Sequence, residues 1–199
     1  MNPHLRLERP SAWVARFAPL IPAGEVLDLA CGGGRHARLV AELGHRVLAV
    51  DRDQEALAAC IGSGIHTDCV DLEQDGFAWP FGNRRFAGVV VVNYLHRPLL
   101  PAVLESLMPG GILIYDTFAS GNQHFGRPAN PDFLLQPGEL LAAVHGAAAD
   151  AEHPLRVLAY EDGYEDLPVP AMRQRICVRR QDQAGLDDAE ACERLRIPH

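Results

Sequence analysis

The apolar positions along roughly the first 120 residues alternate between two patterns. Short, mostly apolar runs predict strands at 25–29, 46–50, 65–70, 86–92 and 112–118. The run at 86–92 is apolar throughout, as expected for a strand covered on both faces. Between the runs, and most clearly at 98–107, apolar residues recur at helical spacing. Strands that alternate with helices predict an α/β fold with a parallel sheet between helices.

The last third of the chain follows a different pattern. Residues 119–136 are rich in Gly, Pro and Asn and predict a long loop, which we interpret as a lid over a substrate. A helix is predicted at 137–145, followed by strands at 155–161 and 172–180 with no helix between them. Two strands joined directly predict an antiparallel pair at one edge of the sheet.

A chain of 199 residues suits one domain of ordinary size. We expect a single domain over 1–199, with an N-terminal helical segment at 1–23, a core at 24–180 and a polar tail at 181–199.

The turn after the first predicted strand is dense in glycine. Asp28 lies near the end of the strand, Gly32–Gly34 follow, and a helical pattern begins at Arg35. These glycines can adopt positive φ and allow a ligand close to the backbone, and the loop amides with the helix start offer donors to a carboxylate or phosphate. The acid inside the turn can also hold a cation. A ligand with a carboxylate, an ammonium and a positive sulfur therefore fits this turn better than a pyrophosphate does.

Three predicted strands end in or near an acid, at Asp28, Asp51 and Asp71. In an open parallel sheet, ligands bind beyond the carboxyl ends of the strands. Asp51 follows Gly34 by 17 residues, close to the spacing at which an acid meets ribose hydroxyls. Asp71, one strand further out, can accept a bond from an adenine amino group, with Leu72 beside the ring.

Composition narrows the class of function. The formal net charge of −8 disfavours a nucleic-acid partner, and the absence of lysine excludes a Schiff-base lysine and a P-loop site. No apolar run approaches the ~18 residues of a membrane span, so we expect no membrane partner. Five cysteines without a Cys-x-x-Cys pair indicate a reduced, cytoplasmic protein without a metal site.

Together these features resemble the class I S-adenosylmethionine-dependent methyltransferases. The segments that carry the resemblance are Val26-Leu-Asp-Leu-Ala-Cys-Gly-Gly-Gly-Arg-His, Ala49-Val-Asp-Arg-Asp, Val70-Asp-Leu-Glu, Phe86-Ala-Gly-Val-Val and Met108-Pro-Gly-Gly-Ile-Leu. Small bacterial members, of the tellurite-resistance and thiopurine types, are the most similar in pattern. Two positions depart from the common pattern, because Ala30 replaces a frequent glycine and Ala87 a frequent aspartate.

The resemblance implies a Rossmann-like three-layer sandwich, with a mostly parallel seven-stranded sheet that ends in an antiparallel C-terminal strand pair. It also implies S-adenosylmethionine as cofactor and S-adenosylhomocysteine as product. The residues it assigns to the cofactor are Asp28, Ala30, Gly32, Gly34, Arg35, Asp51, Arg52, Asp71, Leu72 and Asn93.

The expected reaction is methyl transfer to a small-molecule acceptor by in-line displacement, which depends mainly on positioning. The sequence identifies no certain catalytic residue. Candidates for the acceptor pocket are Tyr94, His96, Tyr115, Asp116, Phe118 and His124. The arginines of the last predicted strand, at 173, 175, 179 and 180, are interpreted as a solvent-exposed face. The oligomeric state is expected to be a monomer or a homodimer.

Two alternatives remain open at this point. Gly32-Gly-Gly-Arg-His-Ala also fits the Gly-x-Gly-x-x-Ala fingerprint of NAD(P)-binding Rossmann oxidoreductases. A non-catalytic S-adenosylmethionine-binding protein would show the same motifs as an enzyme.

Overall fold

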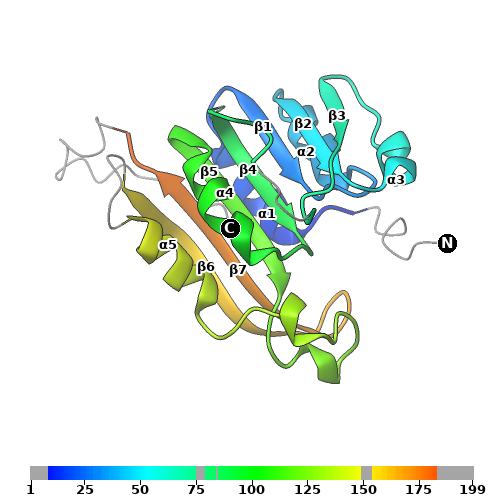
Figure 1. Ribbon diagram of the computed structural model, residues 1–199, viewed down its shortest axis with the longest axis vertical. Helices are drawn as coiled ribbons and strands as arrows, with labels where there is room; N and C mark the ends of the chain where they lie inside the picture. Colours follow the sequence, from blue (N-terminus) through cyan, green and yellow to red (C-terminus); the bar gives the residue numbers. More distant parts are fainter. Residues whose placement is uncertain (1–8, 75–78, 84, 149–153, 183–199) are drawn as a thin grey trace.

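The computed structural model describes residues 9–74, 79–83, 85–148 and 154–182. Its centre is a seven-stranded sheet with the order β3-β2-β1-β4-β5-β7-β6 (Figure 1). The strands are β1 Glu25–Leu29, β2 Arg46–Asp51, β3 Ile65–Cys69, β4 Phe86–Val92, β5 Leu107–Phe118, β6 Leu155–Glu165 and β7 Ala171–Arg180. The first five strands are parallel, and β7 is antiparallel to both β5 and β6. The predicted fold class and antiparallel strand pair are confirmed.

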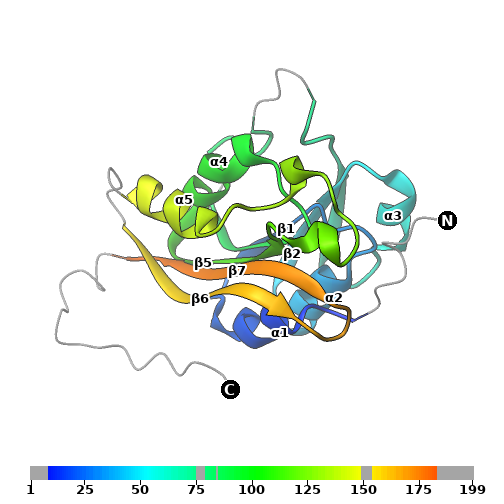
Figure 2. The same ribbon diagram turned by 90° about the horizontal axis from the view of Figure 1, so that it is seen from below.

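Successive residues of the central strands point to opposite faces, and each face buries its own apolar cluster. Val26 of β1 packs with α1 (Ala12–Phe17), α2 (Arg35–Glu42) and α3 (Gln54–Ala59). Leu27, the next residue, packs with α4 (Leu100–Glu105) and α5 (Glu139–Ala148) on the other face. Figure 2 shows α1 and α2 on one side of the sheet and α4 and α5 on the other. Burial on both faces explains the continuous apolar run of β4, whose bounds were predicted correctly.

The connection into β5 differs from the prediction. The α-helix is shorter than the predicted 98–107. The chain first forms a 3₁₀ turn, η3 (Arg97–Leu99), and α4 then ends at Glu105. Leu107 already pairs with Phe86 in the sheet, whereas the next aligned pair is Gly88 with Ile112. The predicted Pro-Gly-Gly turn is therefore an irregularity within β5. An apolar residue such as Leu107 fits either pattern, and here backbone pairing with β4 takes precedence.

The long loop at 119–136 is tied to the rest of the fold and contains two 3₁₀ turns, η4 (Asn122–His124) and η5 (Pro131–Phe133). The Arg97 side chain donates to the carbonyl oxygens of Asp132 at 2.6 Å and Leu134 at 2.9 Å. The same guanidinium binds the Glu139 carboxylate at 2.6 Å. These bonds hold the C-terminal part of the loop against α5, so a lid function for it stays a prediction.

Helix α1, near the N-terminus, lies at the edge of the binding region. Ser11 caps it, because its Oγ accepts from the Trp13 amide at 3.1 Å. The Trp13 and Phe17 rings pack edge to face, 4.6 Å apart, and Trp13 Nε1 donates to the Ile176 carbonyl of β7 at 3.3 Å. This packing places Ser11 beside the carboxyl end of β5. Of the predicted polar tail, residues 183–199 lie outside the described residues.

Candidate functional site

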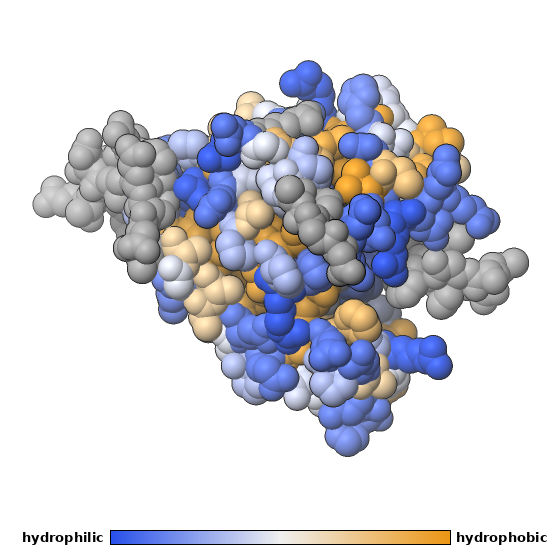
Figure 3. Space-filling view, in the orientation of Figure 1, coloured by the Kyte–Doolittle hydropathy of each residue, from blue (hydrophilic) through white to orange (hydrophobic). Residues whose placement is uncertain are grey.

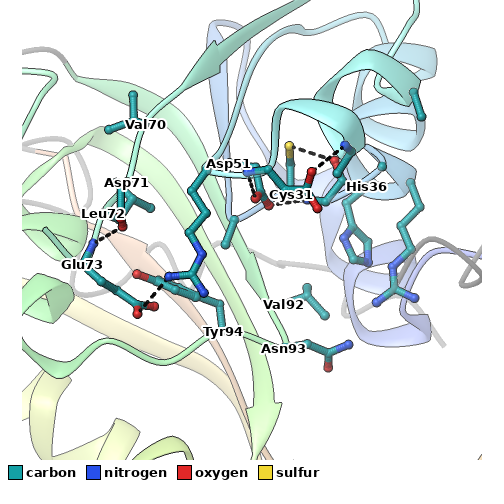
Figure 4. A pocket seen from close by; sticks show the side chains of 18 of the residues that line it. Cys31, His36, Asp51, Val70, Asp71, Leu72, Glu73, Val92, Asn93 and Tyr94 are labelled. Carbon is teal, nitrogen blue, oxygen red and sulfur yellow. Dashed lines mark hydrogen bonds and ion pairs between the residues drawn. The ribbon is translucent and has the colours of Figure 1, made fainter. Parts of the chain in front are cut away.

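A cavity of about 480 Å³ opens at the carboxyl ends of β1, β2 and β4, the edge at which open parallel sheets bind ligands (Figure 4). Eight of the ten residues predicted to bind the cofactor line it: Ala30, Gly32, Arg35, Asp51, Arg52, Asp71, Leu72 and Asn93. Asp28 and Gly34 are not among the lining residues. The lining also contains residues that the sequence did not single out, among them Cys31, His36, Arg38, Glu73 and Val92.

The glycine loop has the positive φ angles that its composition predicted. Gly32 has φ 52° and Gly34 φ 76°, and Ala30, which replaces a frequent glycine, has φ 55°. A Cβ added at Gly34 would lie 2.2 Å from Sγ of Cys60, at the end of α3. Gly34 therefore allows the loop to pack against α3, whereas Ala30 and Gly32 form the wall of the cavity.

Asp51 holds this loop in place. Its carboxylate accepts from the Gly32 amide at 2.8 Å and from the Asp53 amide at 2.9 Å. The Gly34 amide donates to the Cys31 carbonyl at 3.0 Å. The amides of Gly32 and Gly34 are thus used within the protein, contrary to the expectation that the loop amides are donors for a ligand. Each Asp51 oxygen retains a lone pair for a ribose hydroxyl.

Asp28 lies beneath the loop instead of in the cavity. Its side chain is 2% exposed, and Oδ2 has no hydrogen-bond partner among the described residues. Burial, together with the nearby Cys60 thiol, raises the pKa of Asp28 to about 8. The Asp28 carboxyl is therefore largely protonated at neutral pH and supplies little negative charge to the site.

One end of the cavity is acidic. This acidic end comprises Asp51, Asp71 and Glu73, and Figure 4 shows Asp71, Leu72 and Glu73 together on one side of the cavity. Asp71 is exposed, and its carboxylate accepts from the Glu73 amide at 3.0 Å. Arg52 is paired with Glu73 at 3.4 Å. Carboxylates with free lone pairs suit the hydroxyl and amino donors of a nucleoside.

Tyr94, predicted as an acceptor residue, lies at this acidic end in Figure 4. Its hydroxyl is buried without a hydrogen-bond partner among the described residues. Burial raises the pKa of the Tyr94 hydroxyl, and the nearby negative charge of Glu73 adds to the shift. The ring is therefore a neutral wall beside Leu72 and not a general base.

The opposite end is rich in hydrogen-bond donors. This donor-rich end comprises Arg35, His36 and Asn93 of the lining together with Arg173 of β7, whose Nη2 donates to Asn93 Oδ1 at 2.7 Å. The His36 side chain is 3% exposed, and its Nε2 accepts from the Ser11 amide at 3.1 Å. Burial, helped by the charge of Arg35, lowers the pKa of His36 to about 3. The neutral ring therefore carries its proton on Nδ1.

Asp116 organises the residues behind this end. It is 1% exposed, and its Oδ1 accepts from Arg173 at 2.7 Å and from Arg175 at 3.0 Å. Ser11 Oγ donates to Oδ2 at 2.6 Å. Burial alone would raise the pKa of Asp116, but the two arginines and Ser11 lower it overall. Asp116 is thus a carboxylate that holds both arginines.

The predicted acceptor residues do not form one pocket. Tyr115 is 2% exposed in the core and donates to the Tyr94 carbonyl, and Phe118 lies under the Arg173 guanidinium at 4.6 Å. His96 is half-buried before η3, and His124 is exposed in η4. Among these candidates Tyr94 alone lines the cavity, because contact with the cavity depends on tertiary packing and not on closeness to a strand end.

The prediction that the β7 arginines form a solvent-exposed face is wrong, because all four are half-buried. The side chains of Arg173 and Arg175 are 12% and 16% exposed, and both are paired with Asp116. Antiparallel register places Arg173 opposite Phe118 and Arg175 opposite Asp116. The segment 173–178 reads Arg-Gln-Arg-Ile-Cys-Val, which has no regular alternation of polar and apolar residues, and the sequence does not show which acid faces the arginines.

The donor set of this cavity fits S-adenosylmethionine. Carboxylates at the acidic end match the ribose hydroxyls and the adenine amino group, and the unpaired Tyr94 hydroxyl lies beside them. Positive φ at Ala30 and Gly32 opens the middle of the cavity to a ligand. The donor-rich end matches a carboxylate.

A second cavity of about 660 Å³ lies between α4 and α5, with Leu100, Leu104, Ala143 and Ala147 in its lining. Figure 3 shows apolar side chains among polar ones on this face. None of the residues predicted for the site lines this cavity. Among the described residues, no group of three or more His, Cys, Asp or Glu side chains is placed to hold a metal ion. Over the same residues, no helix is long and apolar enough to cross a membrane.

The family model and the relatives that match this chain are all described as methyltransferases. Residues 26–111 match the family described as a methyltransferase domain. The trans-aconitate 2-methyltransferase of Azoarcus sp. (strain BH72) is 29% identical over 177 residues, which cover 87% of this chain and 66% of that protein. The enzyme of the same name from Sinorhizobium fredii is 31% identical over 139 residues, covering 67% of this chain and 48% of that protein.

The fold is also found among solved structures. TehB from Haemophilus influenzae aligns with a TM-score of 0.67 at 18% identity, over 86% of this chain and 63% of TehB. This likeness shows the fold. The chain spans about two thirds or less of the length of these relatives.

Proposed function

We propose that this chain, which carries a class I S-adenosylmethionine-dependent methyltransferase domain as its motifs predicted, transfers a methyl group from S-adenosylmethionine to a small-molecule acceptor. The observation that carries the proposal is the polarity of the cavity. Acids occupy one end, donors occupy the other, and the positive-φ loop lies between them. A nucleoside joined to an amino acid has the same order of groups.

The residues would act mainly by positioning. The cofactor supplies a methyl group on a sulfonium, which is reactive without covalent help from the protein. Asp51 holds the ribose, Asp71 and Leu72 hold the adenine, and Ala30, Gly32 and Arg35 hold the amino-acid portion. Orientation of two reactants in one site lowers a barrier by about 7–11 kcal/mol. Leu72 and Val92, both buried, exclude water from the cavity.

A proton acceptor is needed only when the nucleophile arrives protonated. His36 is a poor candidate, because its Nε2 is bound to the Ser11 amide and its pKa is lowered to about 3 by burial. Asp28, with a pKa raised to about 8 by burial, is not in the lining. The proposal therefore assigns no catalytic base to this chain.

Several finer points belong to the same proposal. The acceptor is a small molecule, as the names of the trans-aconitate 2-methyltransferases give for those relatives. The protein works in the cytoplasm, without a nucleic-acid or membrane partner, as a monomer or homodimer. Its residues form one domain, which agrees with the packing of α1 on the core and with Ser11 at the donor-rich end.

The oxidoreductase alternative is not favoured. Dinucleotide-binding sheets of the Rossmann type have the order 3-2-1-4-5-6. Here the last strand of the chain, β7, is inserted antiparallel between β5 and β6. The relatives described above are methyltransferases, and none is named as an oxidoreductase.

Calorimetric titration tests the choice of cofactor directly. S-adenosylmethionine and NADH are titrated separately into the full chain, and we expect heat with the first only. Binding of NADH alone would refute the proposal. Release of S-adenosylhomocysteine with thiols, phenols, amines, carboxylates and chalcogen oxyanions then separates an enzyme from a silent binder, because a binder releases none.

A further inference from the structure

The donor-rich end contains one arginine without an acid partner and several hydrogen-bond donors that the described residues do not use. Arg35 is half-buried, and its Nη1 donates to the backbone carbonyl of Arg9 at 3.3 Å. No acid lies within ion-pair distance of Arg35 among the described residues. Asp28 does not neutralise it, because burial raises the pKa of Asp28 to about 8.

Arg173 brings a second guanidinium toward the same end. Its Nε is bound to Asp116 and lies 3.8 Å from the Glu165 carboxylate, and its Nη2 donates to Asn93, which leaves Nη1 without a hydrogen-bond partner among the described residues. Burial lowers the pKa of Arg35 and repulsion from Arg173 lowers it further, whereas the charge of Asp116 acts in the opposite direction. Two cations that are close enough to repel each other favour an anion in contact with both.

His36 is the observation that points to a ligand independently of the arginines. Its side chain is 3% exposed and lines the cavity. Nε2 is occupied by the Ser11 amide, so the ring is a donor through Nδ1, and Nδ1 has no partner among the described residues. Nδ1 is not among the buried atoms that lack a partner, so this donor is open to the cavity and available to a ligand or water. The amide of Asn93, whose Oδ1 is used by Arg173, also has its Nδ2 hydrogens available.

The cofactor of the proposed function has one carboxylate, and Arg35 beside the glycine loop can bind it. Arg173 comes from β7 and donates to Asn93 at the end of β4. At neutral pH S-adenosylmethionine has an ammonium, a sulfonium and a carboxylate, so it adds a net positive charge to this end. That charge strengthens the preference for an anion as the second ligand.

We propose that the donor-rich end is an anion subsite for the methyl acceptor, in which Arg173, His36 and Asn93 bind an acceptor carboxylate, with Arg35 shared between this carboxylate and that of the cofactor. The inference rests on the proposed methyl transfer and deepens it, because it makes the acceptor an organic acid. Two arrangements are compatible with this subsite. In the first, the protein binds the carboxylate while another atom of the acceptor is methylated, and in the second, the carboxylate itself is the nucleophile. In either case the carboxylate is a fixed point from which the nucleophile is aligned with the methyl group.

The test is a binding experiment that needs no turnover. The full chain is first titrated with S-adenosylhomocysteine, and the saturated complex is then titrated with benzoate, succinate and tricarballylate at constant ionic strength. The uncharged methyl esters are the ligand controls. We expect at least one carboxylate to bind the loaded protein and its ester not to bind.

Two variants locate the subsite. Arg173→Gln removes one guanidinium, and Asn93→Asp places a negative charge beside it without changing the size of the side chain. Aspartate tolerates the positive φ of 57° at this position, so this variant is usable if Arg173→Gln does not fold. Each is expected to weaken carboxylate binding at least tenfold, and Arg173→Gln is expected to change S-adenosylhomocysteine affinity less than threefold. Arg156→Gln, which removes an exposed charge on β6, is the matched control and should change neither.

The outcomes separate this inference from the function on which it rests. If S-adenosylhomocysteine binds but no carboxylate does, the anion subsite is wrong and the methyltransferase proposal stands. If a carboxylate binds only the free protein and S-adenosylhomocysteine displaces it, the donors serve the cofactor alone and the inference is overturned. If the Arg173 or Asn93 variant binds carboxylate as the unmodified chain does, the subsite lies elsewhere. If S-adenosylhomocysteine does not bind, both proposals fail.

Discussion

The two ends of the cavity are assembled in different ways. The acidic end comes from a short stretch of chain, because Asp51, Asp71 and Glu73 follow two neighbouring parallel strands. The donor-rich end draws on α2, the end of β4 and β7, and Ser11, Asp116 and Arg175 support it from behind. Local sequence pattern is therefore enough to locate the acidic end. The donor-rich end depends on packing between distant segments, and substitutions there should affect stability as well as binding.

The largest effect is expected at Asp116, behind the donor-rich end. Asp116→Ala leaves the half-buried guanidinium groups of Arg173 and Arg175 without this carboxylate and should lower the free energy of unfolding by about 3–5 kcal/mol. Urea denaturation measures the loss. Glu161→Gln removes a carboxylate that is 50% exposed and paired with Arg175, and should cost less than about 1 kcal/mol. Equal losses in the two variants would contradict the organising role of Asp116.

Asp51 tests the acidic end. Asp51→Ala should weaken S-adenosylmethionine binding by about 1.5–3 kcal/mol, because charge-assisted bonds to the ribose are lost. Part of this loss comes from the glycine loop, because Asp51 also accepts a hydrogen bond from the Gly32 amide. Calorimetry of Glu55→Ala, an exposed acid on α3, gives the control for a lost negative charge. An unchanged affinity in Asp51→Ala would remove Asp51 from the site.

The loop between the two ends is tested by two glycines that both have positive φ. Gly34→Ala combines φ 76° with a clash against Cys60, and should destabilise the fold by about 1–3 kcal/mol. Gly44→Ala has φ 95° but open space around the added Cβ, and should cost about 1 kcal/mol. Comparing the thermal unfolding of the two variants isolates the contribution of the close contact between residue 34 and Cys60. If Gly44→Ala is the more damaging, close packing at Gly34 is not what the loop requires.

The final test is the pH dependence of stability that comes from Asp28. Burial raises its pKa from 3.8 to about 8, so between these values the folded protein holds a proton that the unfolded chain has lost. The stabilisation of the folded state by this proton is complete below pH 3.8. It is lost as the pH rises toward 8, with a slope of about 1.4 kcal/mol per pH unit at most.

Asp28→Asn copies the protonated carboxyl and should flatten this part of the stability curve. Denaturation of both proteins at pH 5.5 and 8.5, without cofactor, measures the difference. A variant whose stability falls with pH as steeply as the parent would show that Asp28 is ionised in the folded state.

Much of the fold could be predicted from the sequence because its strands are local and buried. The limits of β1 and β4 were correct to the residue, since each run is bounded by a clear change in polarity. The segment 98–111 was predicted less well, because Leu107 and the Pro-Gly-Gly stretch are compatible with either a helix end or a bulged strand. The direct connection between β6 and β7 correctly indicated antiparallel pairing.

The chain's own order of residues determined the sheet, the glycine loop and the acids that follow its strands, because each depends on neighbours within about one turn or one strand. Only the tertiary structure decided that Asp28 lies under the loop, that Tyr94 belongs to the acidic end, and that Arg173 meets Asn93 across 80 positions of sequence. Those contacts arise from antiparallel register and helix packing. Burial then sets the protonation of Asp28 and His36, and a sequence does not display burial at single polar positions.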